Sequence, residues 1–208
     1  MPIDFAISTL VTLIVVVDPV GLVPTFIAVT HDLPAAAKRE VGIRASVIAA
    51  LILAGSALFG QWLLTRIGVG VPAFRIAGGL LLFSIASEMV FGVRTERQSR
   101  AAEQAVEERV RNIATVPLAI PLMAGPGAIT ASVLIGARAN GDLTRVVILL
   151  VVIAAVGAIC AVVYLVAERI GRLLGATGNL VLSRLLGVVL AALAVQYVVD
   201  GIRTLLAG

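Results

Sequence analysis

The chain has 208 residues, of which 60% are hydrophobic and 13% are charged, and its mean hydropathy is +1.11. Soluble domains are closer to half apolar and a quarter charged, which disfavours a soluble globular protein. The net charge of +4 does not indicate a nucleic-acid partner here, because the basic residues lie between apolar segments, where they set membrane topology.

Six apolar segments reach the length of about 20 residues that a helix needs to cross a bilayer. The sequence therefore predicts an all-α integral membrane protein with six transmembrane helices and the lipid bilayer as its surroundings. The first and fourth of these helices are expected to be broken. The segments cover residues 5–30, 41–65, 72–92, 114–138, 144–167 and 179–202.

The first segment contains the motif VVVDPVGLVP, from Val15 to Pro24, and the fourth contains GPGA, beginning at Gly125. Proline removes a backbone donor and clashes with the preceding turn, while glycine permits backbone angles that a helix forbids. Asp18–Gly21 and Gly125–Gly127 are therefore expected to unwind their helices. Unpaired backbone groups are costly in lipid, so both interruptions are expected to face a polar cavity.

One long polar stretch, from Arg94 to Asn112, separates the third and fourth segments. It divides the chain into a first three-helix unit (1–92), a charged cytoplasmic linker (93–113) and a second three-helix unit (114–208). The connections after the first, third and fifth segments hold eleven of the sixteen Lys and Arg. By the positive-inside rule these connections are cytoplasmic, and both termini lie on the outer side.

The two three-helix units share a sequence pattern, although each match alone is weak in so apolar a chain. Phe74–Arg94 and Ser183–Arg203 align at one constant offset that pairs two arginines and two glycines of each stretch. Because three spans are an odd number, the second unit enters the membrane from the opposite side. This predicts an inverted repeat, an architecture typical of transporters.

Paired interruptions in two such halves indicate a binding site near the membrane midplane. Each break exposes free N–H groups at the positive end of a half-helix, which favours a carboxylate, whereas Asp18 and unwound carbonyls favour an ammonium group or a proton. No further charge lies near either break in the sequence, so a small neutral amino acid is the expected ligand. The predicted substrate-binding residues are Asp18, Pro19, Gly21, Thr25, Gly125, Gly127, Thr130 and Ser132.

Two acids in the apolar segments are candidates for coupling transport to a proton, with a sodium ion as the alternative. Asp18 lies at a break, where an intramembrane acid is a functional hypothesis by default. The alternative is that Asp18 is only a structural cap of the helix break. Glu88 lies near the cytoplasmic end of the third segment, where it either takes part in the pathway or reaches the interface and pairs with Arg94.

DPVGLVPTF together with PLAIPLMAGPGAIT (Pro117–Thr130) resembles the MarC family of bacterial inner-membrane proteins, and the resemblance covers essentially the whole chain. The family is similar to the LysE-type exporters and includes proteins described as proton-coupled transporters of glycine and alanine. The resemblance implies a location in the inner membrane, so the outer side on which the positive-inside rule places both termini is the periplasm. It supports transport better than any particular substrate.

The sequence is also compatible with other functions. Within transport, the alternative is a channel or an exporter of another small solute, and outside transport it is a membrane regulator. An enzyme is not expected, because the sequence lacks a nucleotide loop and a recognisable nucleophile–base arrangement. Neither a metal nor a cofactor is expected, since the chain has one cysteine, Cys160, and one histidine, His31.

Overall fold

The computed structural model describes residues 2–94, 114–139 and 141–207, and this part of the chain is helical and contains no strand. The predicted all-helical class is confirmed. The helices are α1 (Pro2–Val17), α2 (Val23–Val29), α3 (Ala35–Arg66), α4 (Val71–Phe91), η1 (Ala114–Met123), α6 (Pro126–Ala139), α7 (Leu143–Leu165) and α8 (Ala167–Ala207).

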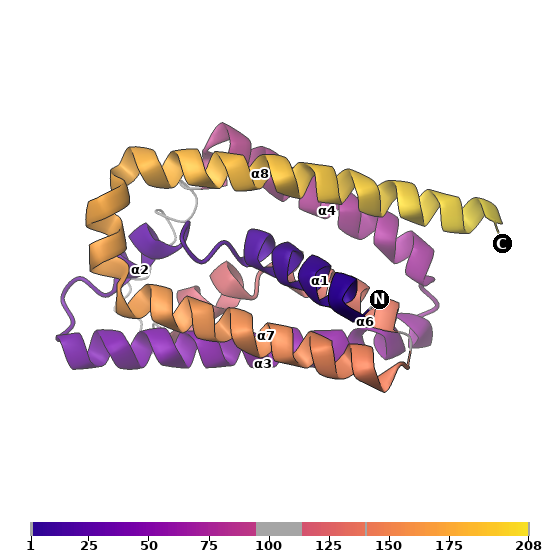
Figure 1. Cartoon of the computed structure of the whole chain (residues 1–208), viewed down its shortest axis with the longest axis horizontal. Helices are drawn as coiled ribbons and strands as arrows, with labels where there is room; N and C mark the ends of the chain where they lie inside the picture. The colour runs from indigo at the N-terminus through magenta and orange to yellow at the C-terminus, as the bar shows by residue number, and fades with distance from the viewer. Residues whose placement is uncertain (1, 95–113, 140, 208) are drawn as a thin grey trace.

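The long helices run roughly along the long axis of the molecule (Figure 1). Helices α3 and α7 lie side by side on one flank, and α4 and α8 form the other flank. Between the two flanks lie α1 and α6, which contact each other and reach both sides. The two segments predicted to contain breaks therefore occupy the centre of the bundle.

Four helices in the described part of the chain are long and apolar enough to cross a membrane, which supports an integral membrane protein. They are α3, α4, α7 and the Thr177–Ala207 part of α8. The first and fourth apolar segments form shorter pieces instead, because each is interrupted near its middle: α1 with α2, and η1 with α6. The six-span arrangement remains a prediction.

The last helix differs from its predicted range of 179–202. It begins at Ala167 and contains a kink at Gly175, whose φ of 59° and ψ of −176° are not helical. Glycine has no Cβ and adopts such a positive φ without strain. The kink turns the first part of α8 across the end of the molecule before the helix continues along α4 (Figure 1).

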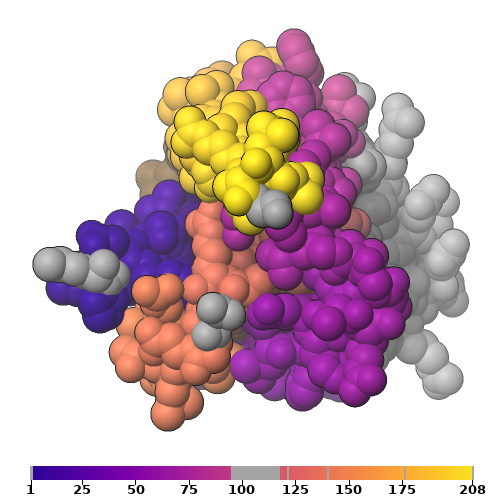
Figure 2. Space-filling model, turned by 90° about the vertical axis from the view of Figure 1, so that its right-hand side faces the viewer, coloured from indigo at the N-terminus to yellow at the C-terminus, as the bar shows by residue number. Residues whose placement is uncertain are grey.

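The N-terminal end of α1 and the C-terminal end of α8 lie at the same end of the molecule, together with the α3–α4 and α6–α7 connections (Figures 1 and 2). At this end Arg138 of α6 pairs with Asp200 of α8 at 3.5 Å and lies over the ring of Tyr197 at 4.7 Å. The predicted linker falls almost entirely on residues 95–113, which lie outside the described residues.

Small residues allow α4 and α8 to approach closely, as is common between helices in membranes. A Cβ added at Gly79 of α4 would lie 2.7 Å from the carbonyl oxygen of Ala194 in α8, and one at Gly187 of α8 would lie 3.1 Å from that of Ala86 in α4. Large apolar side chains such as Leu51, 67% exposed, lie on the outer surface of the bundle. Such a surface suits contact with lipid.

The contact between α6 and α3 provides a test of this packing. A Cβ at Gly136 would overlap the backbone of Ala57, which is not free to move aside. Gly136→Ala is expected to destabilise the protein by about 1–3 kcal/mol, the usual cost of overpacking. Thermal unfolding of the purified protein in detergent measures this effect.

The matched control is Gly55→Ala on α3, where an added Cβ meets open space. Alanine favours a helix over glycine by up to about 1 kcal/mol, so this variant should unfold at the same temperature as the wild type or higher. Equal unfolding temperatures for the two variants would contradict the packing described for Gly136.

Candidate functional site

The first helix break lies between α1 and α2, as the sequence predicts. Residues 18–22 are not helical, and Asp18 has a φ of +53°. Asp tolerates this left-handed conformation better than most residues, and Pro19 disfavours a helical conformation for the residue before it. Asp18 still closes the last turn of α1, since its N–H donates to the carbonyl of Ile14 at 2.9 Å.

The carboxylate of Asp18 folds back over the break. The backbone N–H of Gly21 donates to its Oδ1 at 3.0 Å, and a Cβ at Gly21 would overlap this carboxylate. Asp18 is only 1% exposed, and Pro19 and Thr25 are also buried. Asp18, Pro19 and Gly21 therefore lie in one buried turn, and Thr25 lies in the first turn of α2.

The second break covers residues 124 and 125, so it starts one residue and ends two residues earlier than predicted. Helix η1 has the wide turns of a π-helix, with the N–H of Ala124 donating to the carbonyl of Ala119 at 2.9 Å, and Gly125 lies outside any helix. Pro126 and Gly127, which were expected to be unwound, are instead the first residues of α6. Proline fits this first helical position because the N–H it lacks would have no partner there.

The tertiary structure brings the two breaks close together. A Cβ at Gly127 would lie 3.6 Å from Val16, two residues before Asp18, and would also meet Ile85 of α4. Thr130 turns its methyl group toward Gly78 of α4. Ser132, further along α6, is fully buried, and its Oγ has no hydrogen-bond partner within the described ranges.

Arg94 is a site residue that the sequence does not predict, since it was expected in a solvated cytoplasmic connection. It is 7% exposed and reaches from the end of α4 to the end of α1, where its Nη2 donates to the carbonyl of Val16 at 3.3 Å. Its positive charge attracts the carboxylate of Asp18. The first break therefore contains a buried acid and a buried base.

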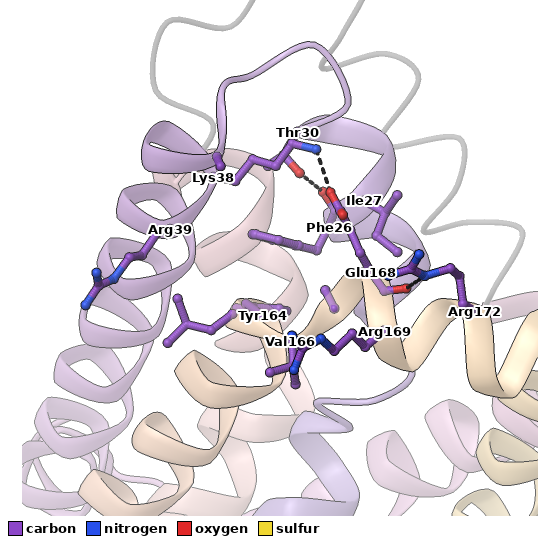
Figure 3. Close-up of a pocket in the computed structure, with 13 residues that line it drawn as sticks. Phe26, Ile27, Thr30, Lys38, Arg39, Tyr164, Val166, Glu168, Arg169 and Arg172 are labelled. Atoms are coloured by element: carbon purple, nitrogen blue, oxygen red, sulfur yellow. Dashed lines mark hydrogen bonds and ion pairs between the residues drawn. The ribbon is translucent and has the colours of Figure 1, made fainter.

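Two further residues near Asp18 were not predicted. Ser183 of α8 is buried and lies near the Asp18 carboxylate. Tyr164 of α7 stacks on Phe26 of α2, with ring centroids 4.6 Å apart (Figure 3). The Tyr164 hydroxyl is buried, and no hydrogen-bond partner for it lies in the described part of the chain.

The sequence offers weak signals for these residues. Arg94 belongs to a run of charges and Ser183 to the start of an apolar segment, so neither stands out in the sequence. Tyr164 is one of only two tyrosines, which is the one clue available. Glu88, the second predicted acid, is half-buried on α4, six residues before Arg94.

A buried aspartate and a nearby buried arginine at a broken helix, enclosed by long apolar helices, define an integral membrane protein with a polar site in its interior. The chain matches the family described as MarC family integral membrane protein over residues 3–206, and it belongs to this family.

Its relatives are similar along nearly their whole length. The chain is 36% identical over 203 residues to the UPF0056 membrane protein MJ1677 of Methanocaldococcus jannaschii, covering 98% of both chains. It is 35% identical over 196 residues to the UPF0056 membrane protein YhcE of Escherichia coli, covering 94% of this chain and 91% of the relative. No solved structure matches the chain.

The geometry of the turn at Asp18 predicts that a side chain at Gly21 destabilises the protein. Gly21→Ala should displace the carboxylate and break its hydrogen bond to the backbone N–H, at a cost of about 1–3 kcal/mol for the buried group left without a partner. The control is Gly70→Ala, where an added Cβ would make ordinary contact with Pro72 at 3.7 Å. The unfolding temperatures of both variants in detergent test this prediction. A Gly21→Ala variant as stable as the wild type would contradict the geometry of the turn.

A double-mutant cycle tests the attraction between Asp18 and Arg94. Arg94→Gln leaves a buried carboxylate without its cation and should destabilise the protein by about 3–5 kcal/mol. Adding Asp18→Asn removes the remaining charge while keeping an acceptor for Gly21, so the double variant should regain part of this stability. Strictly additive effects in chemical unfolding would show that the two charges do not interact.

Proposed function

We propose that this protein is a secondary transporter of small neutral amino acids such as glycine and alanine, coupled to a proton, and not an enzyme. The observation that carries the proposal is the buried Asp18 at a helix break with Arg94 beside it. Charged side chains inside membrane segments are expensive, and where they occur they mark substrate or ion pathways.

The two charges suit the two ends of a zwitterion. The guanidinium of Arg94 can bind a carboxylate through two parallel hydrogen bonds, and the positive N-terminal end of α6 adds to this preference. The carboxylate of Asp18 can bind an ammonium group or a proton. Ser132 supplies a buried hydroxyl on α6, which begins beside the first break.

The proposed architecture is two inverted three-helix repeats that cross the inner membrane six times, with both termini in the periplasm. The order of elements supports it: each half begins with an interrupted helix, α1 with α2 or η1 with α6, and continues with two long helices. The termini lie at one end of the molecule, while Lys38 and Arg172 lie at the other, as the positive-inside rule requires of cytoplasmic connections.

Uptake into sealed vesicles tests this function directly. The full chain is reconstituted into proteoliposomes, and the accumulation of labelled glycine, alanine, leucine and glutamate is measured with and without an inward pH gradient or sodium gradient. We expect accumulation of glycine and alanine that depends on the pH gradient. Leakage without accumulation would indicate a channel, and the absence of flux for every solute would favour a regulatory protein.

The substitution Asp18→Asn separates coupling from binding. It keeps the size of the side chain and an acceptor for the Gly21 N–H but removes the carboxylate that would bind the proton. Gradient-driven accumulation should fall to the level of empty vesicles, while exchange of labelled for unlabelled alanine continues. If Asp18 instead holds the ammonium group, binding weakens by roughly 1.5–3 kcal/mol and exchange is lost as well.

The control for this variant is Asp32→Asn, in the exposed loop after α2 where Asp32 contacts His31. This substitution changes the net charge by the same amount without touching the site, so uptake should equal that of the wild type. Wild-type accumulation by Asp18→Asn would refute the role proposed for Asp18.

A further inference from the structure

A basic pocket of about 350 Å³ lies at the end of the molecule where α2, the start of α3, the end of α7 and the start of α8 meet (Figure 3). Phe26 and the buried Tyr164 form part of its wall. Its charged lining residues are four bases and one acid, namely Lys38, Arg39, Arg169, Arg172 and Glu168.

The single acid does not neutralise the pocket. The Nζ of Lys38 lies 2.9 Å from Glu168 Oε1, and this hydrogen bond and the charge of Lys38 hold the pKa of Glu168 below its usual range. Glu168 is therefore ionised at neutral pH and balances one of the four bases. The Nε of Arg172 donates to the backbone carbonyl of Glu168 at 3.2 Å, which anchors that side chain in the pocket wall.

An apolar groove of about 700 Å³ adjoins this pocket and shares Ile27, Glu168 and Arg172 with it. The groove lies between α2 and the first part of α8, and the kink at Gly175 forms one of its edges. The rest of its wall is mainly apolar. The pocket and the groove are thus neighbouring depressions, one cationic and one apolar, with three lining residues in common.

A second apolar groove, of about 490 Å³ between α3 and α7, differs in charge. It is lined by aliphatic residues and Ser46, and none of its described lining residues is charged. The acyl chain of any lipid can occupy this uncharged groove, whatever headgroup the lipid carries. A headgroup preference is expected only in the groove that adjoins the basic pocket.

We propose that the basic pocket and the adjoining groove together bind one anionic phospholipid, with its phosphate among Lys38, Arg169 and Arg172 and an acyl chain along α2 and α8. Basic pockets between membrane helices attract anionic headgroups, with each Lys or Arg contributing to the affinity. A free phosphate would fill the cationic part alone and leave the apolar part without an occupant.

Lipid titration of the purified full chain in detergent tests this proposal. Native mass spectrometry counts bound phosphatidylglycerol and phosphatidylcholine with identical acyl chains, and the shift in thermal unfolding is recorded with each lipid and with inorganic phosphate. We expect saturable binding of phosphatidylglycerol at one site, with a higher unfolding temperature, and weaker binding of phosphatidylcholine. Equal binding of the two lipids, or equal stabilisation by inorganic phosphate, would overturn the proposal.

Two variants locate the site. Arg169→Gln with Arg172→Gln removes two charges and should weaken phosphatidylglycerol binding roughly 10- to 30-fold. Ala28→Phe fills the apolar groove from an exposed position on α2 and should reduce binding of phosphatidylglycerol without affecting the charges.

Each variant has a matched control. Arg66→Gln with Arg203→Gln removes two exposed charges at the opposite end of the molecule, and Ala154→Phe fills the groove between α3 and α7. Both controls should bind phosphatidylglycerol as the wild type does. Unfolding temperatures without lipid verify that every variant is folded, and wild-type affinity in the folded Arg169/Arg172 variant would refute the proposed site.

Discussion

The carboxylate of Asp18, buried where the first helix breaks, is the constraint on which the rest of the structure depends. A charged group withdrawn from water is tolerated only when it is paired and hydrogen-bonded. Gly21 donates its backbone N–H, the buried Ser183 lies near the carboxylate, and Arg94 supplies a positive charge. These partners come from the break itself, from α8 and from the end of α4, so one buried acid fixes how three parts of the chain meet.

The packing around this acid requires small residues. Gly21 leaves room for the folded-back carboxylate, and Gly127 allows the start of α6 to lie against Val16 at the end of α1. In the same way Gly79 and Gly187 bring α4 and α8 into backbone contact. The abundant glycine and alanine of the chain therefore serve close approach between helices, which in a membrane replaces the hydrophobic effect as the source of association.

The two ends of the molecule differ in charge and in shape. At one end both termini lie near an Arg138–Asp200 pair, whereas at the other the kink at Gly175 carries the first part of α8 across the bundle. This turn places Arg169 and Arg172 opposite Lys38 and Arg39, which come from the start of α3. These basic residues act as topology signals in the sequence. They line a common pocket only because the kink in α8 brings them together.

The sequence by itself determined the helical class, the ranges of α4 and α7 and the first break, because apolar segment length, proline and glycine act locally along the chain. It placed the end of the second break two residues late, since a proline can end one helix or begin the next and the wide turns of η1 leave no clear pattern. Only the tertiary structure decided which charges are buried. Arg94 follows an apolar segment just as a solvated loop residue does, and its burial depends on a contact with Val16, 78 residues earlier in the chain.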